Sequence, residues 1–492
     1  MARMRTIRGA ALLAMMAAGT GVTALAAAEM EPAPRQQFEH QGEVDALFAP
    51  WARSDSPGCS VAVTRDGRTV LERGYGMADL EQGVAIRPET VFNMASVSKQ
   101  FTAASLLLLE QQGKLSVDDD IRKYVPEIPS YGKTITLRML ANHTSGMRDW
   151  PELLALAGWN WVDDVPPAWG LAMIARQKHL NFEPGSKYSY SNTGYFLMAL
   201  VVERVSGQTL GEFADRHIFK PLGMLHSRFY DDRTMIMKNR AVGYLQRDDG
   251  SIGAWRPTYQ VVGDGALLTT TGDMVLWERN FLEPRLGRDP AGLIAKMVEP
   301  TRLTGGKVSN YAFGLELGEY RGLKTVDHSG GIPGYRTFML RFPEQKLSVQ
   351  LMCNYSAVQI RKLAYGVAEA YLQDQFTAAA QPETKRNEPT KPASAPASQA
   401  LPQFAGQYYS DELAATYTFT VDSAGLSSTV GYLAPRRWQA SGTDRFVDAE
   451  EDGISIRFTR QGGPGGKISG FTLSEEDGIQ ALDFKRVTGS GR

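Results

Sequence analysis

Residues 92–101 read Phe-Asn-Met-Ala-Ser-Val-Ser-Lys-Gln-Phe, and this run holds the most informative pair of the chain, Ser96 and Lys99. If the run is helical from Ser96 onward, positions i and i+3 share one face, so the lysine amine reaches the serine hydroxyl. A serine hydroxyl needs an adjacent proton acceptor to act as a nucleophile at neutral pH. The start of a helix also offers unpaired backbone N–H groups to a developing oxyanion. The pair therefore predicts a nucleophilic serine with a lysine partner.

Two later motifs strengthen this interpretation. Taken alone, a Ser-x-x-Lys tetrad more often marks a solvated helix start that is capped by the serine. However, residues 190–192 read Tyr-Ser-Asn, and residues 328–331 read His-Ser-Gly-Gly. With these three motifs in this order, the chain resembles the serine β-lactamase and penicillin-binding-protein superfamily, most closely its class C β-lactamase, D-aminopeptidase and esterase branch. The resemblance covers roughly residues 48–373.

The resemblance implies a role for each residue of the first two motifs. Ser96 would be the nucleophile that forms an acyl-enzyme, and either Lys99 or Tyr190 would accept its proton. A phenol has an unperturbed pKa near ~10, so Tyr190 would need a nearby cation, Lys99 or His328, to act as a phenolate. Asn192 would orient Lys99 and a substrate carbonyl through its amide group. The sequence leaves open which of Lys99 and Tyr190 is the general base.

The third motif would bind the substrate. By analogy with the family, the backbone N–H groups of Ser96 and Gly331 would form the oxyanion hole. Gly330 and Gly331 have no Cβ, which would let a substrate approach the strand edge beside His328 and Ser329. Many relatives carry Lys-Thr-Gly or Lys-Ser-Gly here, and a neutral imidazole is a weaker carboxylate anchor than an ammonium group. We therefore expect peptides with D-residues, amides or esters to be better substrates than penicillins or cephalosporins.

A second hypothesis comes from another class of protein. The same fold could serve a catalytically silent protein that binds or senses peptidoglycan fragments. The intact set of three motifs argues against this alternative, because a pure binder needs no nucleophile. The motifs do not separate a β-lactamase from a D-aminopeptidase or an esterase.

Composition excludes several other functions. The chain has 492 residues, of which 43% are hydrophobic and 22% are charged, and its formal net charge is −1. These values fit a soluble globular protein of two or three domains, and they suggest neither nucleic acid nor an anionic membrane as a partner. The six histidines show no metal-ligand spacing, and no phosphate loop or dinucleotide fingerprint is evident. We expect a small-molecule or peptide substrate, no metal and no cofactor, and we make no prediction of the oligomeric state.

The first 28 residues have the pattern of a secretory signal peptide. Arg3, Arg5 and Arg8 precede an apolar stretch at residues 10–18, and small residues follow up to residue 28. The alternative is a membrane anchor, but the apolar stretch is short for a span and is interrupted by Gly19 and Thr20. The pattern predicts that residues 1–28 are removed by cleavage and that the mature protein is periplasmic or secreted and has no membrane span.

The order of elements predicts a mixed α/β (α+β) sandwich over residues 29–376. Two strands flank Asp66-Gly67, buried helices are expected near residues 96–112 and 195–205, and a C-terminal helix is expected at residues 362–373. Because late strands are expected at 312–317, 337–342 and 347–354, the first and last strands should meet in one antiparallel sheet. The resemblance implies the same β-lactamase/transpeptidase-like sandwich.

The C-terminal part has a different composition. Residues 377–400 are rich in Pro, Ala and Ser and read as a linker. Short alternating runs between turns predict a small antiparallel β domain, a barrel, over residues 401–492.

Cys59 and Cys353 lie in apolar, strand-like runs, and these strands are neighbours in the resembled fold. A disulfide and two buried thiols are equally compatible with this pattern.

Overall fold

The computed structural model describes residues 38–160, 165–256, 261–379, 401–451, 453–476 and 478–488. The predicted signal peptide, residues 1–28, lies outside these residues, as do residues 380–400 of the predicted linker. Among the helices in the described ranges, none is long and apolar enough to cross a membrane.

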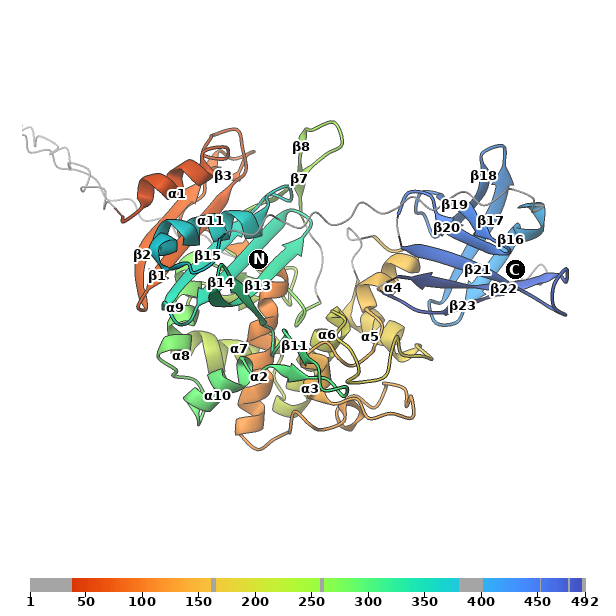
Figure 1. The fold of residues 1–492 in the computed structure, drawn as a ribbon, viewed down its shortest axis with the longest axis horizontal. Helices are drawn as coiled ribbons and strands as arrows, with labels where there is room; N and C mark the ends of the chain where they lie inside the picture. The colour runs from red at the N-terminus through yellow and green to blue at the C-terminus, as the bar shows by residue number, and fades with distance from the viewer. Residues whose placement is uncertain are drawn as a thin grey trace, which may run out of the picture. The chain divides into compact units, whose positions relative to one another are not determined.

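A six-stranded sheet organises the chain up to residue 379 (Figure 1). Every neighbouring pair of strands in it is antiparallel, and the first strand of the chain pairs with the last strand of this region, as predicted. The order across the sheet is β12 (Glu316–Tyr320), β13 (Leu323–Ile332), β14 (Tyr335–Phe342), β15 (Leu347–Cys353), β1 (Cys59–Arg65) and β2 (Arg68–Tyr75).

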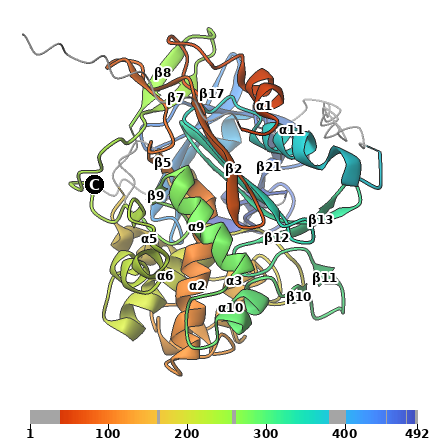
Figure 2. The same ribbon diagram turned by 90° about the vertical axis from the view of Figure 1, so that its left-hand side faces the viewer.

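Helices cover both faces of this sheet (Figures 1 and 2). On β14, Phe338 and Leu340 pack in one buried cluster with Val367 of α11 (Ile360–Leu372) and with α1 (Gln41–Phe48). Met339, which points to the opposite face, belongs to the cluster that contains α2 (Lys99–Gln111) and α9 (Thr271–Leu282). The mixed α/β sandwich predicted from the element order is therefore confirmed.

Helix α2 runs through the interior of the sandwich. Its residues Lys99–Leu109 are all buried, as its almost uniformly apolar surface predicts. It packs against α6 (Asn192–Ser206), which ends at Gly207 in the left-handed conformation, with a φ of 72°. The first two motifs lie at the N-terminal ends of these two helices.

The remaining elements of this region are short. Within the described residues, three two-stranded sheets pair β3 with β4, β7 with β8 and β10 with β11, and a three-stranded sheet joins β5, β9 and β6. The bounds are β3 (Met77–Asp79), β4 (Val84–Ala85), β5 (Phe92–Asn93), α3 (Leu137–Ala141), α4 (Trp150–Leu156), α5 (Pro167–Ala175), α7 (Leu210–Ala214), α8 (Lys220–Leu222), β6 (Arg228–Phe229), β7 (Gly243–Gln246), β8 (Ile252–Trp255), β9 (Leu267–Thr269), α10 (Pro290–Met297), β10 (Thr301–Arg302) and β11 (Val308–Ser309).

One predicted strand is displaced along the sequence. The strand expected at residues 312–317 is observed as the edge strand β12, which begins at Glu316. The apolar residues before it form a turn in which Gly314 has a φ of 78° and lies against the backbone of Lys99 and Gln100. A Cβ at Gly314 would lie 2.8 Å from backbone atoms of α2, so this run is buried by packing on a helix and not by strand pairing.

The C-terminal part is a closed antiparallel barrel (Figure 1). It closes because β23 pairs with β16, and its interior contains the buried aromatic residues Tyr408, Phe419, Phe458 and Phe471. The predicted barrel is confirmed. Its strands are β16 (Gly406–Ser410), β17 (Ala415–Asp422), β18 (Gly425–Val430), β19 (Arg436–Gly442), β20 (Arg445–Asp448), β21 (Ile454–Arg460), β22 (Ile468–Glu475) and β23 (Leu482–Arg486).

Cys59 and Cys353 form a disulfide between β1 and β15. They stand opposite each other in the antiparallel register, and both side chains are fully buried. Of the two alternatives that the sequence leaves open, the structure contains the disulfide.

Candidate active site

Ser96 lies in a tight turn that opens into α2. The 3₁₀ turn Ala95–Ser98 precedes α2, and Ala95 has a φ of 47°, which costs a non-glycine residue roughly 1–2 kcal/mol. Two hydrogen bonds hold this conformation: the Ala95 N–H donates to Asn93 Oδ1 at 2.9 Å, and Ser98 Oγ donates to the Ala95 carbonyl at 2.6 Å. The turn places Ser96 at the wall of a cavity.

Lys99 is fully buried beneath Ser96 and has three polar partners. Its Nζ lies 3.2 Å from Ser96 Oγ, 2.9 Å from Asn192 Oδ1 and 2.7 Å from the Asp264 carbonyl oxygen. The last two partners are acceptors only, so they take both N–H groups of a neutral amine. The lone pair of a neutral amine would then face the Ser96 hydroxyl.

The environment of Lys99 also favours the neutral amine. Burial lowers the pKa of Lys99 to about 8, although the Asp264 and Asp149 carboxylates act in the opposite direction. About a tenth of the amine is therefore neutral at pH 7 and about half at pH 8, the range in which a general base is needed.

Asn192 is oriented by a buried carboxylate. Asn192 Nδ2 donates to Asp149 Oδ2 at 3.0 Å, and the backbone N–H groups of Asn192 and Thr193 donate to Asp149 Oδ1. Burial raises the pKa of Asp149, whereas these N–H groups, which open α6, and the helix dipole act in the opposite direction. With its amide nitrogen held by Asp149, Asn192 presents Oδ1 to Lys99.

Tyr190 also borders the cavity, and its ring lies next to Lys99. Lys99 Nζ lies 4.9 Å from the centroid of its ring, and 37% of Tyr190 is exposed toward the cavity. Burial raises the pKa of the Tyr190 phenol well above its ordinary value, and a hydrogen bond with Ser96 offsets only part of that rise. Tyr190 therefore keeps its proton near neutral pH, which favours Lys99 as the proton acceptor between the two alternatives.

His328 lies behind this group and does not line the cavity. Its Nδ1 lies 2.7 Å from the Ser329 carbonyl, which can only accept, so Nδ1 carries the proton and Nε2 accepts from the Tyr311 hydroxyl at 2.8 Å. Burial and then the charge of Lys99 lower the pKa of His328 to about 3. The imidazole is thus neutral with both nitrogens occupied, a placement that differs from the expected contact with substrate.

The rest of the third motif divides between two faces of β13. Ser329 Oγ accepts from Arg361 of α11 at 3.3 Å and does not border the cavity. A Cβ at Gly330 would lie 2.3 Å from the Met94 carbonyl, so this glycine allows β13 to pack on the turn before Ser96. Of the four residues 328–331, only Gly331 lines the cavity.

The cavity measures about 290 Å³. Ser96, Tyr190, Asn192 and Gly331 border it together, and its wider walls include the side chains of Tyr230, Trp255 and Ile332. Among the residues that the structure describes, no group of three His, Cys, Asp or Glu side chains could hold a metal ion.

Four residues of this site have no role in the sequence-based prediction: Asp149 and Tyr311, and also His143 and Asp264, whose segments resemble family segments. His143 Nδ1 accepts from the Ser191 N–H at 3.1 Å, and its ring lies 4.3 Å from that of Tyr190. The available signal was an isolated histidine within Asn-His-Thr-Ser-Gly at residues 142–146. No local pattern marked Asp149 or Tyr311, because their partners lie on distant segments.

Comparisons with known proteins agree with this geometry. The model of the family described as Beta-lactamase matches residues 36–372. The D-aminopeptidase of Brucella anthropi is 30% identical over 323 residues, which are 64% of this chain and 60% of that protein. The chain thus spans about 60% of the length of the curated D-aminopeptidases that it matches.

Two solved structures share the fold. The octameric penicillin-binding protein homologue from Pyrococcus abyssi has a TM-score of 0.62 at 24% identity and covers 90% of this chain and 99% of its own. The D-amino acid amidase from Ochrobactrum anthropi SV3, complexed with L-phenylalanine amide, has a TM-score of 0.58 at 23% identity and covers 68% of this chain and 99% of its own.

Proposed function

This chain belongs to the Beta-lactamase family of serine hydrolases, and from that premise we propose that it hydrolyses small peptides, amides or esters through a Ser96 acyl-enzyme. The preferred class is the D-amino-acid amide or peptide. The observation that carries the proposal is the position of Lys99, whose two acceptor-only partners leave its lone pair to the Ser96 hydroxyl.

In the first step, Ser96 Oγ attacks the substrate carbonyl carbon while Lys99 takes the hydroxyl proton. The oxyanion that forms is stabilised by the backbone N–H groups of Ser96 and Gly331, and losing one such donor typically costs ~3–4 kcal/mol of barrier. The C–N or C–O bond then breaks, and the leaving group takes the proton that Lys99 holds, relayed by Tyr190. The product of this half-reaction is an ester of Ser96.

In the second step, water attacks the acyl carbon and Lys99 takes a proton from that water. The bond to Ser96 Oγ breaks, and the serine recovers its proton from Lys99. Asn192 holds Lys99 in place through both steps, because its amide nitrogen is held in turn by Asp149.

The cavity supports the choice of substrate class. Among the described residues that line the cavity there is neither a lysine nor an arginine, and the neutral His328 is not one of them. This lining suits a substrate carboxylate, such as that of a penicillin, less well than a free amine, which Asp264 at the wall could bind. The names of the D-aminopeptidase and D-amino acid amidase relatives agree with such a substrate.

The test is hydrolysis of a D-alanyl anilide, a short-chain nitrophenyl ester and a cephalosporin by the purified protein. We expect the anilide and the ester to be turned over, and Ser96→Ala to abolish both activities. Ser105→Ala is the matched control, since Ser105 lies on the same helix and donates only within it, to the Phe101 carbonyl at 2.8 Å. Full activity in Ser96→Ala would overturn the proposal, and no turnover by the unmodified protein would favour the silent peptidoglycan-fragment binder.

We also propose that the protein is exported and acts in the periplasm or outside the cell, after cleavage of residues 1–28. The Cys59–Cys353 disulfide supports an oxidising compartment. The proposed boundaries are a hydrolase domain at 29–376, a linker at 377–400 and a β domain at 401–492. The mass of the mature protein and its recovery in the periplasmic or culture fraction test this proposal.

A further inference from the structure

The segment Arg148-Asp149 holds Asn192 and the start of α6, while Ser191 of the Tyr-Ser-Asn motif also donates to His143. Asp149 binds Asn192 and the start of α6, as described above, and it also accepts from Ser191 Oγ at 3.1 Å. The carbonyl of Arg148 accepts from Thr193 Oγ1 at 2.7 Å. The position of Asn192 against Lys99 therefore depends on where residues 148 and 149 are held.

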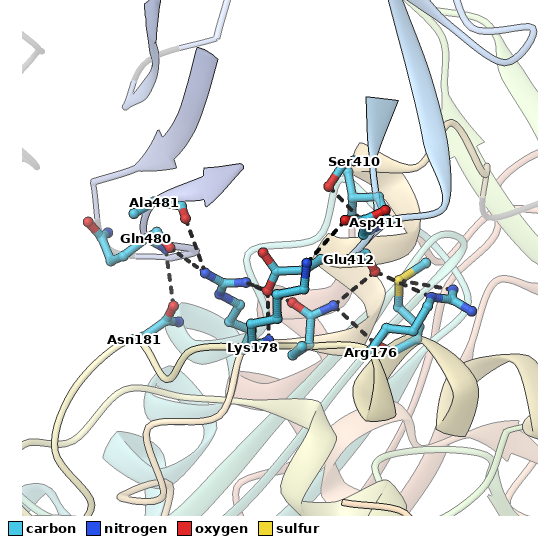
Figure 3. Close-up of polar contacts among 12 residues, drawn as sticks. Arg176, Lys178, Asn181, Ser410, Asp411, Glu412, Gln480 and Ala481 are labelled. Atoms are coloured by element: carbon cyan, nitrogen blue, oxygen red, sulfur yellow. Dashed lines mark hydrogen bonds and ion pairs between the residues drawn. The ribbon is translucent and has the colours of Figure 1, made fainter. Parts of the chain in front are cut away.

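The side chain of Arg148 contacts the barrel. Its Nη1 donates to Glu412 Oε1 at 2.7 Å, and its Nη2 donates to the Gln480 carbonyl at 2.6 Å. Glu412 follows β16, and Gln480 lies between β22 and β23 (Figure 3). One guanidinium group thus joins two loops of the barrel to the segment that holds Asn192.

The contact is buried and charged. The side chains of Arg148 and Glu412 are 0% and 2% exposed, respectively. When one partner of such a pair is removed, the other is left as an uncompensated charge in a low-dielectric interior. Because its other acceptors, Gln177 Oε1 and the Gln480 carbonyl, carry no charge, Glu412 is the charged partner of Arg148 in this contact.

Further bonds hold the same two surfaces together. Glu412 Oε1 also accepts from the Lys178 N–H at 2.8 Å, and the Gln480 N–H donates to Asn181 Oδ1 at 3.1 Å (Figure 3). The Tyr417 hydroxyl of the barrel donates to the Leu156 carbonyl at 2.8 Å, at the end of α4. Helix α4 begins directly after Asp149 and ends at Leu156. The barrel therefore contacts residues 148–156 at both ends, through Arg148 and through Leu156.

We propose that Glu412 of the barrel is a positioning residue for hydrolysis: through Arg148 it holds Asp149, and through Asp149 it holds Asn192 against Lys99. This inference rests on the proposed function and deepens it, because it makes the barrel a part of the working hydrolase. Glu412 touches neither the cavity nor a reacting group, so it acts only by geometry. A displacement of about 1 Å at a catalytic group can cost on the order of 100-fold in rate.

The test compares Glu412→Gln with Asp411→Asn in the full-length protein. Glutamine keeps the shape and one acceptor oxygen of Glu412, removes its charge and replaces the other oxygen with an NH2 donor. Asp411 is the matched control, because it pairs with Lys178 across the same contact at 3.2 Å but is half exposed. Rates are measured per active site, after titration of the acyl-enzyme burst, so that loss of folded protein is not counted as loss of rate.

We expect kcat per titrated site to fall about 10-fold to 100-fold in Glu412→Gln, with KM within about 3-fold and Asp411→Asn within about 2-fold of the parent. An unchanged kcat per site, with loss only in the number of titratable sites, would overturn the proposal. If Glu412→Gln does not fold, Arg148→Lys takes its place, because an ammonium keeps the charge but does not span both Glu412 and Gln480.

Hydrogen exchange separates this proposal from the proposed function. We expect the backbone amides of residues 191–193 to exchange faster in Glu412→Gln than in the parent and in Asp411→Asn. This readout needs no turnover, so it remains decisive even if no substrate is hydrolysed. Unchanged exchange at residues 191–193 would contradict the positioning role, whereas absent turnover in the parent would contradict only the proposed hydrolysis.

Discussion

Two buried bases, Lys99 and His328, lie close to Tyr190, and they differ in their hydrogen-bond partners. Burial lowers the pKa of both, to about 8 for Lys99 and to about 3 for His328. Lys99 lies 3.2 Å from the Ser96 hydroxyl, whereas His328 donates to the Ser329 carbonyl and accepts from the Tyr311 hydroxyl. A perturbed pKa therefore marks the site, but the hydrogen-bond partners decide which base can move a proton.

The largest effect is expected in Lys99→Met, which tests whether Lys99 is the base. Methionine keeps the length of the side chain and removes the amine, so Ser96 loses its proton acceptor. We expect kcat/KM for a D-alanyl anilide to fall by about 10³-fold, within the usual range for a general base. Lys114→Met, at the exposed end of the same helix region, should retain activity. Near-normal activity in Lys99→Met would transfer the role of base to Tyr190.

The pH dependence of kcat/KM gives the next largest effect. Only the neutral amine of Lys99 accepts a proton, so the rate should rise about tenfold per pH unit up to the pKa of about 8 and then level off. Between pH 6 and 8 this amounts to roughly a 50- to 100-fold rise. His328, with its pKa lowered to about 3, should add no inflection in this window. An inflection near pH 6.5 that is lost in His328→Gln would contradict the assignment.

The sequence predicts the contact of Lys99 with Ser96 better than it predicts the surroundings of His328. The contact between Ser96 and Lys99 follows from their i, i+3 spacing at one helix start, so a local rule is sufficient. The orientation of Asn192 depends on Asp149, which lies 43 positions earlier on another element. The neutrality of His328 likewise depends on its burial and then on the nearby Lys99, while Tyr311 occupies its Nε2. Such pairings are set by tertiary packing, and no sequence pattern in either segment predicts them.

The same distinction applies to the fold. The buried helix α2, the meeting of β1 with β15 and the barrel follow from hydrophobic periodicity and from the order of elements. The run before β12 is apolar enough for a strand, yet it packs as a turn on α2, because Gly314 lets the two backbones approach closely. Periodicity does not distinguish a residue buried by sheet pairing from one buried against a helix.

The smallest effect is expected in His328→Gln, which tests the protonation state of His328 alone. The folded-state pKa of His328 is about 3, below its ordinary value of 6.5, so the unfolded chain binds more protons between these two values. The native protein therefore loses stability as the pH falls from 6.5 toward 3. Glutamine does not titrate, so the melting temperature of His328→Gln should fall less steeply over this range, while kcat/KM drops only about tenfold. Parallel melting curves for the two proteins would mean that His328 is already charged in the native state, and the contrast with Lys99 would fail.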